Sequence, residues 1–203
     1  MGCLGNVLFT LGQESDASQH FRMQLQLAKE ISEPLMECKA YHGLSKVYLQ
    51  QGCYDTCLDM EKKFLKSCMS IGDEEGVGVA YHYMGMAHGA RGEYKQAIDF
   101  FNRRLRIVQS RRDLEGEAEC YANMACAYAL DGDTEMSAKM SQQSKSLIVS
   151  NVCNPLLASN HSLGVRQSSH TGKPCSCLLC VCARGQIDMP AGSEKAKAMA
   201  RHR

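Results

Sequence analysis

Four glycines, Gly12, Gly52, Gly92 and Gly132, stand forty residues apart along most of the chain. Other positions keep the same register. Eleven residues before the glycines stand Met1, Tyr41, Tyr81 and Tyr121. Five residues after them stand small side chains, in Ala17, Cys57, Ala97 and Ser137. A fixed period of this size indicates a repeat architecture, in which each unit is one supersecondary motif that stacks on its neighbours.

Each unit is predicted to be a pair of helices. In the third unit the apolar spacing before the glycine follows one helical face, with Tyr81, Met84, Gly85 and His88. A second stripe follows it, with Tyr94, Ala97, Ile98, Phe101, Leu105 and Val108. Gly92 can adopt the left-handed geometry that closes the first helix. We expect Ala97 to lie where the two helices approach closely and Phe101 to fill the core below it.

The motif of the third unit resembles that of the tetratricopeptide repeats. It is carried by Tyr81, Met84, Gly85, His88, Gly92, Ala97 and Phe101. The usual period is about 34 residues, whereas the period of forty is similar to that of the Leu-Gly-Asn repeat-enriched spindle adaptor. It is more loosely similar to the repeats of kinesin light chains, rapsyn and some ciliary and motor-associated proteins.

The resemblance implies an all-α fold, a tetratricopeptide-repeat α-solenoid in which antiparallel helix pairs form a right-handed superhelix. It covers residues 1–149 in four units, at about 1–33, 34–73, 74–113 and 114–149. Two units depart from the pattern nine residues after the glycine, where Glu61 and Ser141 replace the aromatic that Phe21 and Phe101 supply. We expect looser packing there, with Phe64 one turn further on as a compensating side chain.

Function is expected to reside in the concave groove, which the family builds from the first helix of each unit and uses to take up a peptide or partner helix. The family register places these residues in the groove: Asn6, Lys39, His42, Lys46, Gln50, His82, Tyr83, Met86, Glu119, Asn123 and Cys126. The resemblance implies that Asn123 hydrogen-bonds the backbone of an extended ligand.

The charge of the groove changes from unit to unit. Lys39, His42 and Lys46 make unit two basic, unit three is apolar, and unit four is mixed. This gradient suits a peptide with an acidic end and an apolar anchor. His42 and His82 occupy equivalent positions, but no carboxylate or cysteine repeats beside both, so we expect them to line the groove rather than to bind metal.

A group of arginines at the end of one helix is predicted to be a solvated face that complements the helix dipole, with an acidic partner as the alternative. It comprises Arg103, Arg104, Arg106, Arg111 and Arg112. No phosphate loop, nucleophile motif or framed pair of acids is present, so we expect a non-enzymatic adaptor without a cofactor.

The two ends of the chain differ from the repeats. The match begins at Met1 with apolar residues where a solenoid end normally carries a polar cap, so we expect a fragment or shortened isoform of a longer array. A natural start that relies on a partner is the alternative. Residues 150–203 lack periodicity and carry 7 Lys and Arg against 2 Asp and Glu. They are expected to form a basic, disordered tail.

The body, residues 1–149, carries 16 Lys and Arg against 20 Asp and Glu, which is no signature of nucleic-acid binding. The chain starts without a signal peptide and has no run of about 18 apolar residues, so membrane attachment is not expected. We therefore expect a reduced, cytoplasmic protein, associated with the cytoskeleton or a cilium.

The tail contains a cysteine-rich tract with Cys175, Cys177, Cys180 and Cys182. Four thiolates can bind Zn²⁺, but structural zinc sites usually place two pairs across a longer loop. Three interpretations stay open: a tail from alternative splicing that has no specific role, a metal- or thiol-active tract, and a palmitoylated anchor.

Overall fold

The computed structural model describes residues 2–153, with side chains described for residues 4–149. This part of the chain contains helices and no strand. The helices are α1 (Gly2–Thr10), α2 (Glu14–Glu30), α3 (Pro34–Gln50), α4 (Tyr54–Ile71), α5 (Glu74–Ala90), α6 (Tyr94–Ser110), α7 (Leu114–Asp131) and α8 (Thr134–Cys153). The prediction of an all-α fold is confirmed. The predicted tail beyond residue 153 lies outside the described residues.

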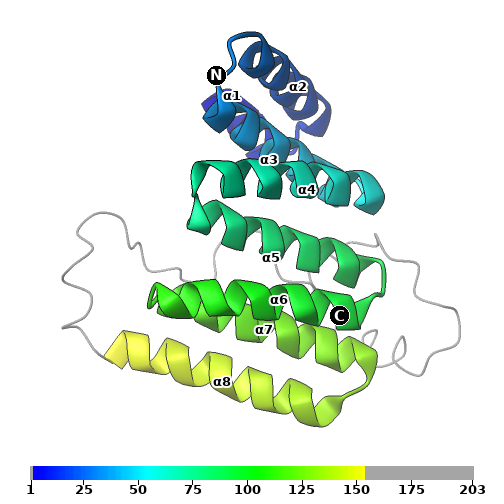
Figure 1. The fold of residues 1–203 in the computed structure, drawn as a ribbon. Helices are drawn as coiled ribbons and strands as arrows, with labels where there is room; N and C mark the ends of the chain where they lie inside the picture. The colour runs from blue at the N-terminus through cyan, green and yellow to red at the C-terminus, as the bar shows by residue number, and fades with distance from the viewer. Residues whose placement is uncertain (1, 154–203) are drawn as a thin grey trace, which may run out of the picture.

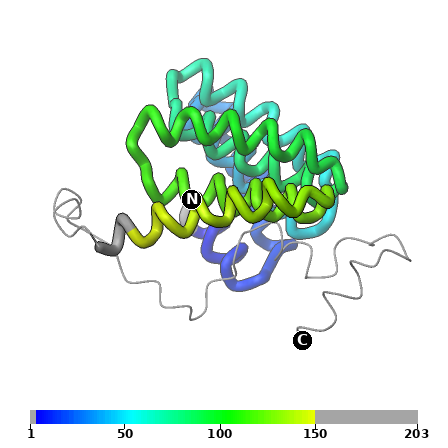
Figure 2. The backbone as a smooth tube through the Cα atoms, turned by 90° about the horizontal axis from the view of Figure 1, so that it is seen from below, coloured from blue at the N-terminus to red at the C-terminus, as the bar shows by residue number. Residues whose placement is uncertain are grey.

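The helices form one continuous stack (Figure 1). Each helix packs against the helix before it and the helix after it, and α3 also contacts α1 and α5. The first helices of successive units therefore lie side by side. Figure 1 shows the α1–α2 pair tilted relative to the α7–α8 pair, and Figure 2 looks along the stack from the α8 end. We call the surface formed by α1, α3, α5 and α7 the inner face.

The forty-residue glycines make the turn inside each helix pair. Gly12, Gly52, Gly92 and Gly132 have φ of 76°, 75°, 80° and 98°, in the left-handed region that a residue without Cβ adopts at no cost. After Gly92, the amide of Glu93 returns to the carbonyl of His88 at 2.9 Å. These bonds satisfy carbonyls that the end of α5 would otherwise leave unpaired.

Aspartates cap the first helices of units three and four. Asp73 caps α5 by accepting from the amide of Gly76, and Asp113 caps α7 by accepting from the amide of Gly116, each at 2.9 Å. Such a side-chain cap stabilises a helix by about 1 kcal/mol. A Cβ on Gly116 would come close to the Asp113 carboxylate, but the same cap forms at the start of α8, where Asp133 accepts from the amide of Met136 at 2.9 Å.

The predicted core is confirmed in units one and three. Ala97 and Phe101 are fully buried, and the ring of Phe101 lies so close to Gly85 that a Cβ there would come within 2.6 Å of it. Phe21 packs on Gly5 in the same way, at 2.7 Å. In these two units an aromatic ring of the second helix therefore packs directly on a glycine of the first helix. We call this pair the glycine–aromatic plug.

Candidate functional site

The eleven predicted groove residues differ in exposure. Asn6 and Lys39 are exposed. Six are half-buried, namely His42, Lys46, Gln50, Tyr83, Glu119 and Cys126. The remaining three are buried, with exposed fractions of 5% for His82, 2% for Met86 and 1% for Asn123. A ligand could reach these three side chains only if their neighbours moved, so in this structure they support the inner face rather than form its surface.

Unit two replaces the glycine–aromatic plug by a polar pair. Ser45 occupies the glycine position and Glu61 the aromatic position, and both are fully buried. The Ser45 hydroxyl contacts Glu61 Oε1, and the same oxygen lies 3.2 Å from His42 Nδ1. Glu61 Oε2 is buried without a hydrogen-bond partner among the described residues. Burial raises the pKa of Glu61, while the bonds from His42 and Ser45 partly oppose that rise.

This cluster is not a catalytic triad. In a triad the histidine lies between the hydroxyl and the carboxylate, whereas here Glu61 lies between Ser45 and His42. Ser45 is also fully buried and cannot reach a substrate. Glu61, where looser packing was expected, is thus held by hydrogen bonds to Ser45 and His42. Phe64 compensates for the missing aromatic as predicted, because its ring stacks on the His42 ring with the centres 4.8 Å apart.

Two lysines flank His42 on the same face of α3. Lys39 is exposed and Lys46 half-buried, and neither has a carboxylate partner among the described side chains. The Lys46 ammonium lies 4.9 Å from the centre of the Phe9 ring of α1. Burial lowers the pKa of Lys46, which means that its charge is poorly solvated. An anion on this face would find two cations that are not yet neutralised.

Units three and four are joined by an arginine that the sequence placed on a solvated face. Arg104 of α6 donates to His82 Nδ1 at 2.6 Å and to Glu119 of α7 at 2.6 Å, and its side chain is 13% exposed. The expectation that all five arginines are solvated is wrong for Arg104, because α6 directs it between the first helices of two units.

The proton position on His82 follows from this contact. A guanidinium can only donate, so Nδ1 must accept and His82 is neutral with its proton on Nε2. Burial first, and then the Arg104 charge, lower the pKa of His82 to about 4. Burial alone would raise the pKa of Glu119, but His82 and Arg104 hold it below its ordinary value.

Tyr83 connects the two histidine sites. Its ring meets the His42 ring edge-on at 4.8 Å and the His82 ring edge-on at 5.2 Å. Burial raises the pKa of its hydroxyl. A polar row therefore runs along the inner face from Glu61 through both histidines to Glu119. The two histidines share a register position, but one faces a carboxylate and the other a guanidinium.

The sequence did not identify Glu61 and Arg104 as partners of the histidines. A signal existed for both. Within the chain, Ser45 and Glu61 change together relative to the glycine–phenylalanine pairs of units one and three. Arg104 aligns with Phe64 and not with an exposed position. Neither signal names the partner, because the contacting side chains belong to different helices.

Asn123 lies deeper than the resemblance implied. Its Oδ1 is buried and has no hydrogen-bond partner among the described residues. A buried carbonyl oxygen without a partner is unfavourable by about 1–3 kcal/mol. A backbone N–H that reached this oxygen would remove that cost, provided that the side chains above it moved.

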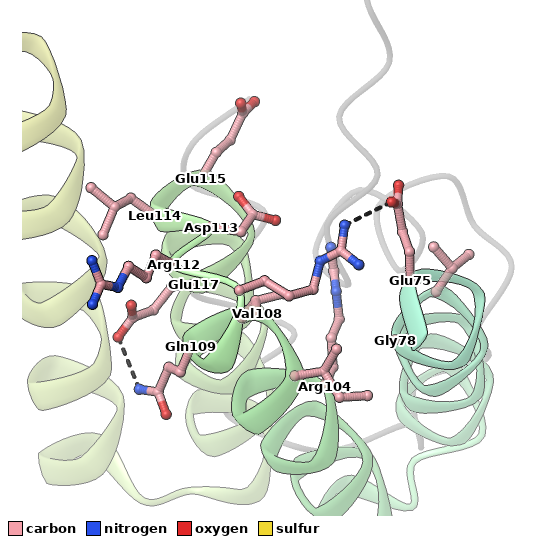
Figure 3. Close-up of a pocket in the computed structure, with 13 residues that line it drawn as sticks. Glu75, Gly78, Arg104, Val108, Gln109, Arg112, Asp113, Leu114, Glu115 and Glu117 are labelled. Atoms are coloured by element: carbon pink, nitrogen blue, oxygen red, sulfur yellow. Dashed lines mark hydrogen bonds and ion pairs between the residues drawn. The ribbon is translucent and has the colours of Figure 1, made fainter. Parts of the chain in front are cut away.

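The hollow drawn in Figure 3 lies elsewhere. It has a volume of about 830 Å³ between α5, α6 and α7, and none of the predicted groove residues lines it. Charges of both signs line it: Arg111 pairs with Glu75 at 2.9 Å, and Gln109 donates to Glu117 at 3.0 Å. We find no chemistry in it that selects a ligand.

Four of the described cysteines, Cys38, Cys57, Cys68 and Cys120, are buried, whereas Cys53 is exposed and Cys126 half-buried. Cys38 and Cys68 lie with their sulfurs 3.2 Å apart in the core of unit two, and burial raises the pKa of both thiols. No group of three potential metal ligands occurs among the described residues. Cys175, Cys177, Cys180 and Cys182 lie outside them. Within residues 2–153 no helix is long and apolar enough to span a bilayer.

Comparisons with known proteins agree with this architecture. The sequence model described as tetratricopeptide repeat matches residues 36–110 and 76–147. No curated protein matches the sequence. The crystal structure of BtubC (BKLC) from P. vanneervenii is similar in fold, with a TM-score of 0.66 and 14% identity over 82% of this chain and 66% of that chain. Because the repeat model covers more than half of the sequence, the protein belongs to the tetratricopeptide repeat family.

Proposed function

We propose that this protein is a non-enzymatic adaptor that binds a peptide or helix of a partner protein along its inner face. The proposal extends the general role of the family, which binds protein partners, to a particular surface. The acidic end of the peptide would lie on the unit-two face, which we define as Lys39, His42 and Lys46. Its apolar anchor would lie further along, near the half-buried ring of Tyr83.

The observation that carries this proposal is the pair of unneutralised lysines on α3. Some charged side chains along the repeats are paired, such as Arg91 with Asp55 at 2.8 Å and Arg103 with Asp99 at 2.9 Å, whereas others, Lys66 among them, have no ion-pair partner among the described residues. Lys39 and Lys46 have none among the described residues, and Lys46 is also partly desolvated. A carboxylate from a partner would compensate both charges.

The test is charge reversal in the full chain. Proteins recovered from cells with the unaltered chain are compared with those recovered by Lys39→Glu with Lys46→Glu. The control is Lys62→Glu with Lys66→Glu, which makes the same change in net charge on exposed positions of α4. We expect the first variant to lose its partners and the control to retain them, with binding that weakens as salt is added. Equal recovery by both variants would refute the inner-face model.

A further inference from the structure

The buried carboxyl group of Glu61 lies beside His42 and links the unit-two face to pH, which its lysines do not. His42 keeps 24% of its side-chain surface exposed, whereas the carboxylate next to its Nδ1 is completely enclosed. All contacts of the His42 ring are with Glu61, Phe64 and Tyr83. Its Nε2 therefore has no hydrogen-bond partner among the described residues. This nitrogen is available to a ligand. It donates a hydrogen bond when it is protonated and accepts one when it is not.

The possible proton positions can be counted. The contact between Nδ1 and Glu61 Oε1 needs one proton, which lies on one atom or the other. If the pair holds only that proton, it resides on Nδ1 and Nε2 presents a lone pair. If the pair holds a second proton, either Nδ1 and Nε2 both carry one, or Glu61 donates to Nδ1 and Nε2 carries the other. In both of these arrangements Nε2 presents an N–H. A third arrangement, with the second proton on Glu61 Oε2, would leave a lone pair on Nε2, but that proton would find no acceptor, because Oε2 has no hydrogen-bond partner among the described residues.

The surroundings of Glu61 favour the state with the second proton. Its Oε2 is buried without a partner, which penalises an ionised carboxylate. Ser45 has one hydroxyl proton but two acceptors in reach, Glu61 Oε1 and the carbonyl of His42 at 2.8 Å. When the hydroxyl donates to the carbonyl, Oε1 receives no proton from Ser45, so that an ionised Glu61 is stabilised by His42 alone. Burial raises the pKa of Glu61, in agreement with this geometry.

Other ionisable groups lie around the Glu61–His42 pair. None of them forms a hydrogen bond with Glu61 or His42 among the described residues. They are, on α3, Cys38, Lys39 and Lys46; on α4, Cys57 and Cys68; on α5, His82 and Tyr83; and on α6, Arg104. Two further carboxylates act on these groups, Asp73 on Cys38 and Glu119 on Tyr83 and His82, and Glu119 is paired with Arg104. An anion that approaches His42 between Lys39 and Lys46 therefore meets positive charge and a proton donor.

We propose that His42 is a proton-linked contact for the acidic segment of the partner, and that Glu61 is the positioning residue that keeps an N–H on Nε2. The segment's carboxylate accepts this N–H while Lys39 and Lys46 neutralise its charge. Binding is then accompanied by uptake of a proton from solvent whenever the pair lacks the second one. This inference rests on the proposed function and adds to it a dependence on pH that lysines alone would not produce.

The experiment measures binding of a fluorescently labelled hexaglutamate peptide to the full chain between about pH 8 and about pH 6, at constant ionic strength. The glutamates of the peptide stay ionised throughout this range, whereas imidazole is the side chain that titrates near it. We expect the affinity to rise as the pH falls, by at most about tenfold per pH unit, the limit for uptake of one proton.

Three variants assign the effect. His42→Asn should remove the dependence on pH. Glu61→Gln should move it to lower pH, because an amide cannot stabilise the imidazolium or supply its proton. His88→Asn is the matched control, since His88 also contacts a carboxylate, that of Glu93, but at the turn between α5 and α6. It should leave the profile unchanged.

A second replacement keeps the test decisive if Glu61→Gln fails to fold. Ser45→Gly with Glu61→Phe installs the plug of units one and three and should shift the profile in the same direction. Absence of peptide binding, a flat profile for the unaltered chain, or an unchanged profile for the Glu61 variants would each overturn the inference. Binding that needs Lys39 and Lys46 but ignores pH would overturn the inference alone and leave the proposed function intact.

Discussion

Burial of His82, together with the Arg104 guanidinium beside it, makes the stability of this protein dependent on pH in a calculable way. The pKa of His82 is about 4 in the folded chain and 6.5 as a free side chain. A base with a depressed pKa stabilises the fold fully above 6.5, and this stability is lost as the pH falls towards 4. The difference of 2.5 units corresponds to about 3 kcal/mol in total, of which about 2 kcal/mol is lost between about pH 7.5 and about pH 5.

The perturbation is His82→Asn, which removes the titrating group and leaves a polar side chain beside Arg104. Urea unfolding of both proteins at about pH 7.5 and about pH 5 isolates the histidine, because all other groups titrate in both chains. We expect the unaltered protein to lose about 2 kcal/mol more than the variant over this interval. If the two proteins lose equal stability, Arg104 does not donate to Nδ1 and the assignment of the proton to Nε2 is wrong.

Three further variants test the packing. Phe101→Ala should lower the free energy of unfolding by about 3–5 kcal/mol through the cavity left beneath Gly85, measured by urea unfolding. Ala97→Leu should lower it by about 1–3 kcal/mol, because the helices of unit three meet there; an unchanged midpoint of thermal unfolding would refute the register. Ser45→Gly with Glu61→Phe should stabilise by about 1–4 kcal/mol. The raised pKa of Glu61 means that its contribution falls as the pH rises, so the gain should be larger at about pH 8 than at about pH 5.

The helices and turns could be read from the chain because they depend on local spacing. A glycine recurs every forty residues because the turn inside each helix pair has one residue with positive φ, and Ala97 and Phe101 keep fixed distances from Gly92. These requirements are imposed within a single helix pair, so they leave a period in the sequence. The register of the inner face follows from the same period, which is why Lys39 and His42 could be placed on one face of a helix.

The contacts that give the inner face its chemistry depend on side chains that meet across packed helices. In the sequence, Glu61 interrupts the glycine–aromatic pattern and Arg104 belongs to a group expected to be solvated. In the structure, Glu61 Oε1 lies 3.2 Å from His42 Nδ1 on the other helix of its pair. Arg104 likewise donates to His82 Nδ1, at 2.6 Å. His42 and His82 hold equivalent positions in the repeat, yet a carboxylate faces one and a guanidinium the other. A proton's position on an imidazole is set by the group across from it, and that group is brought there only when the helices pack.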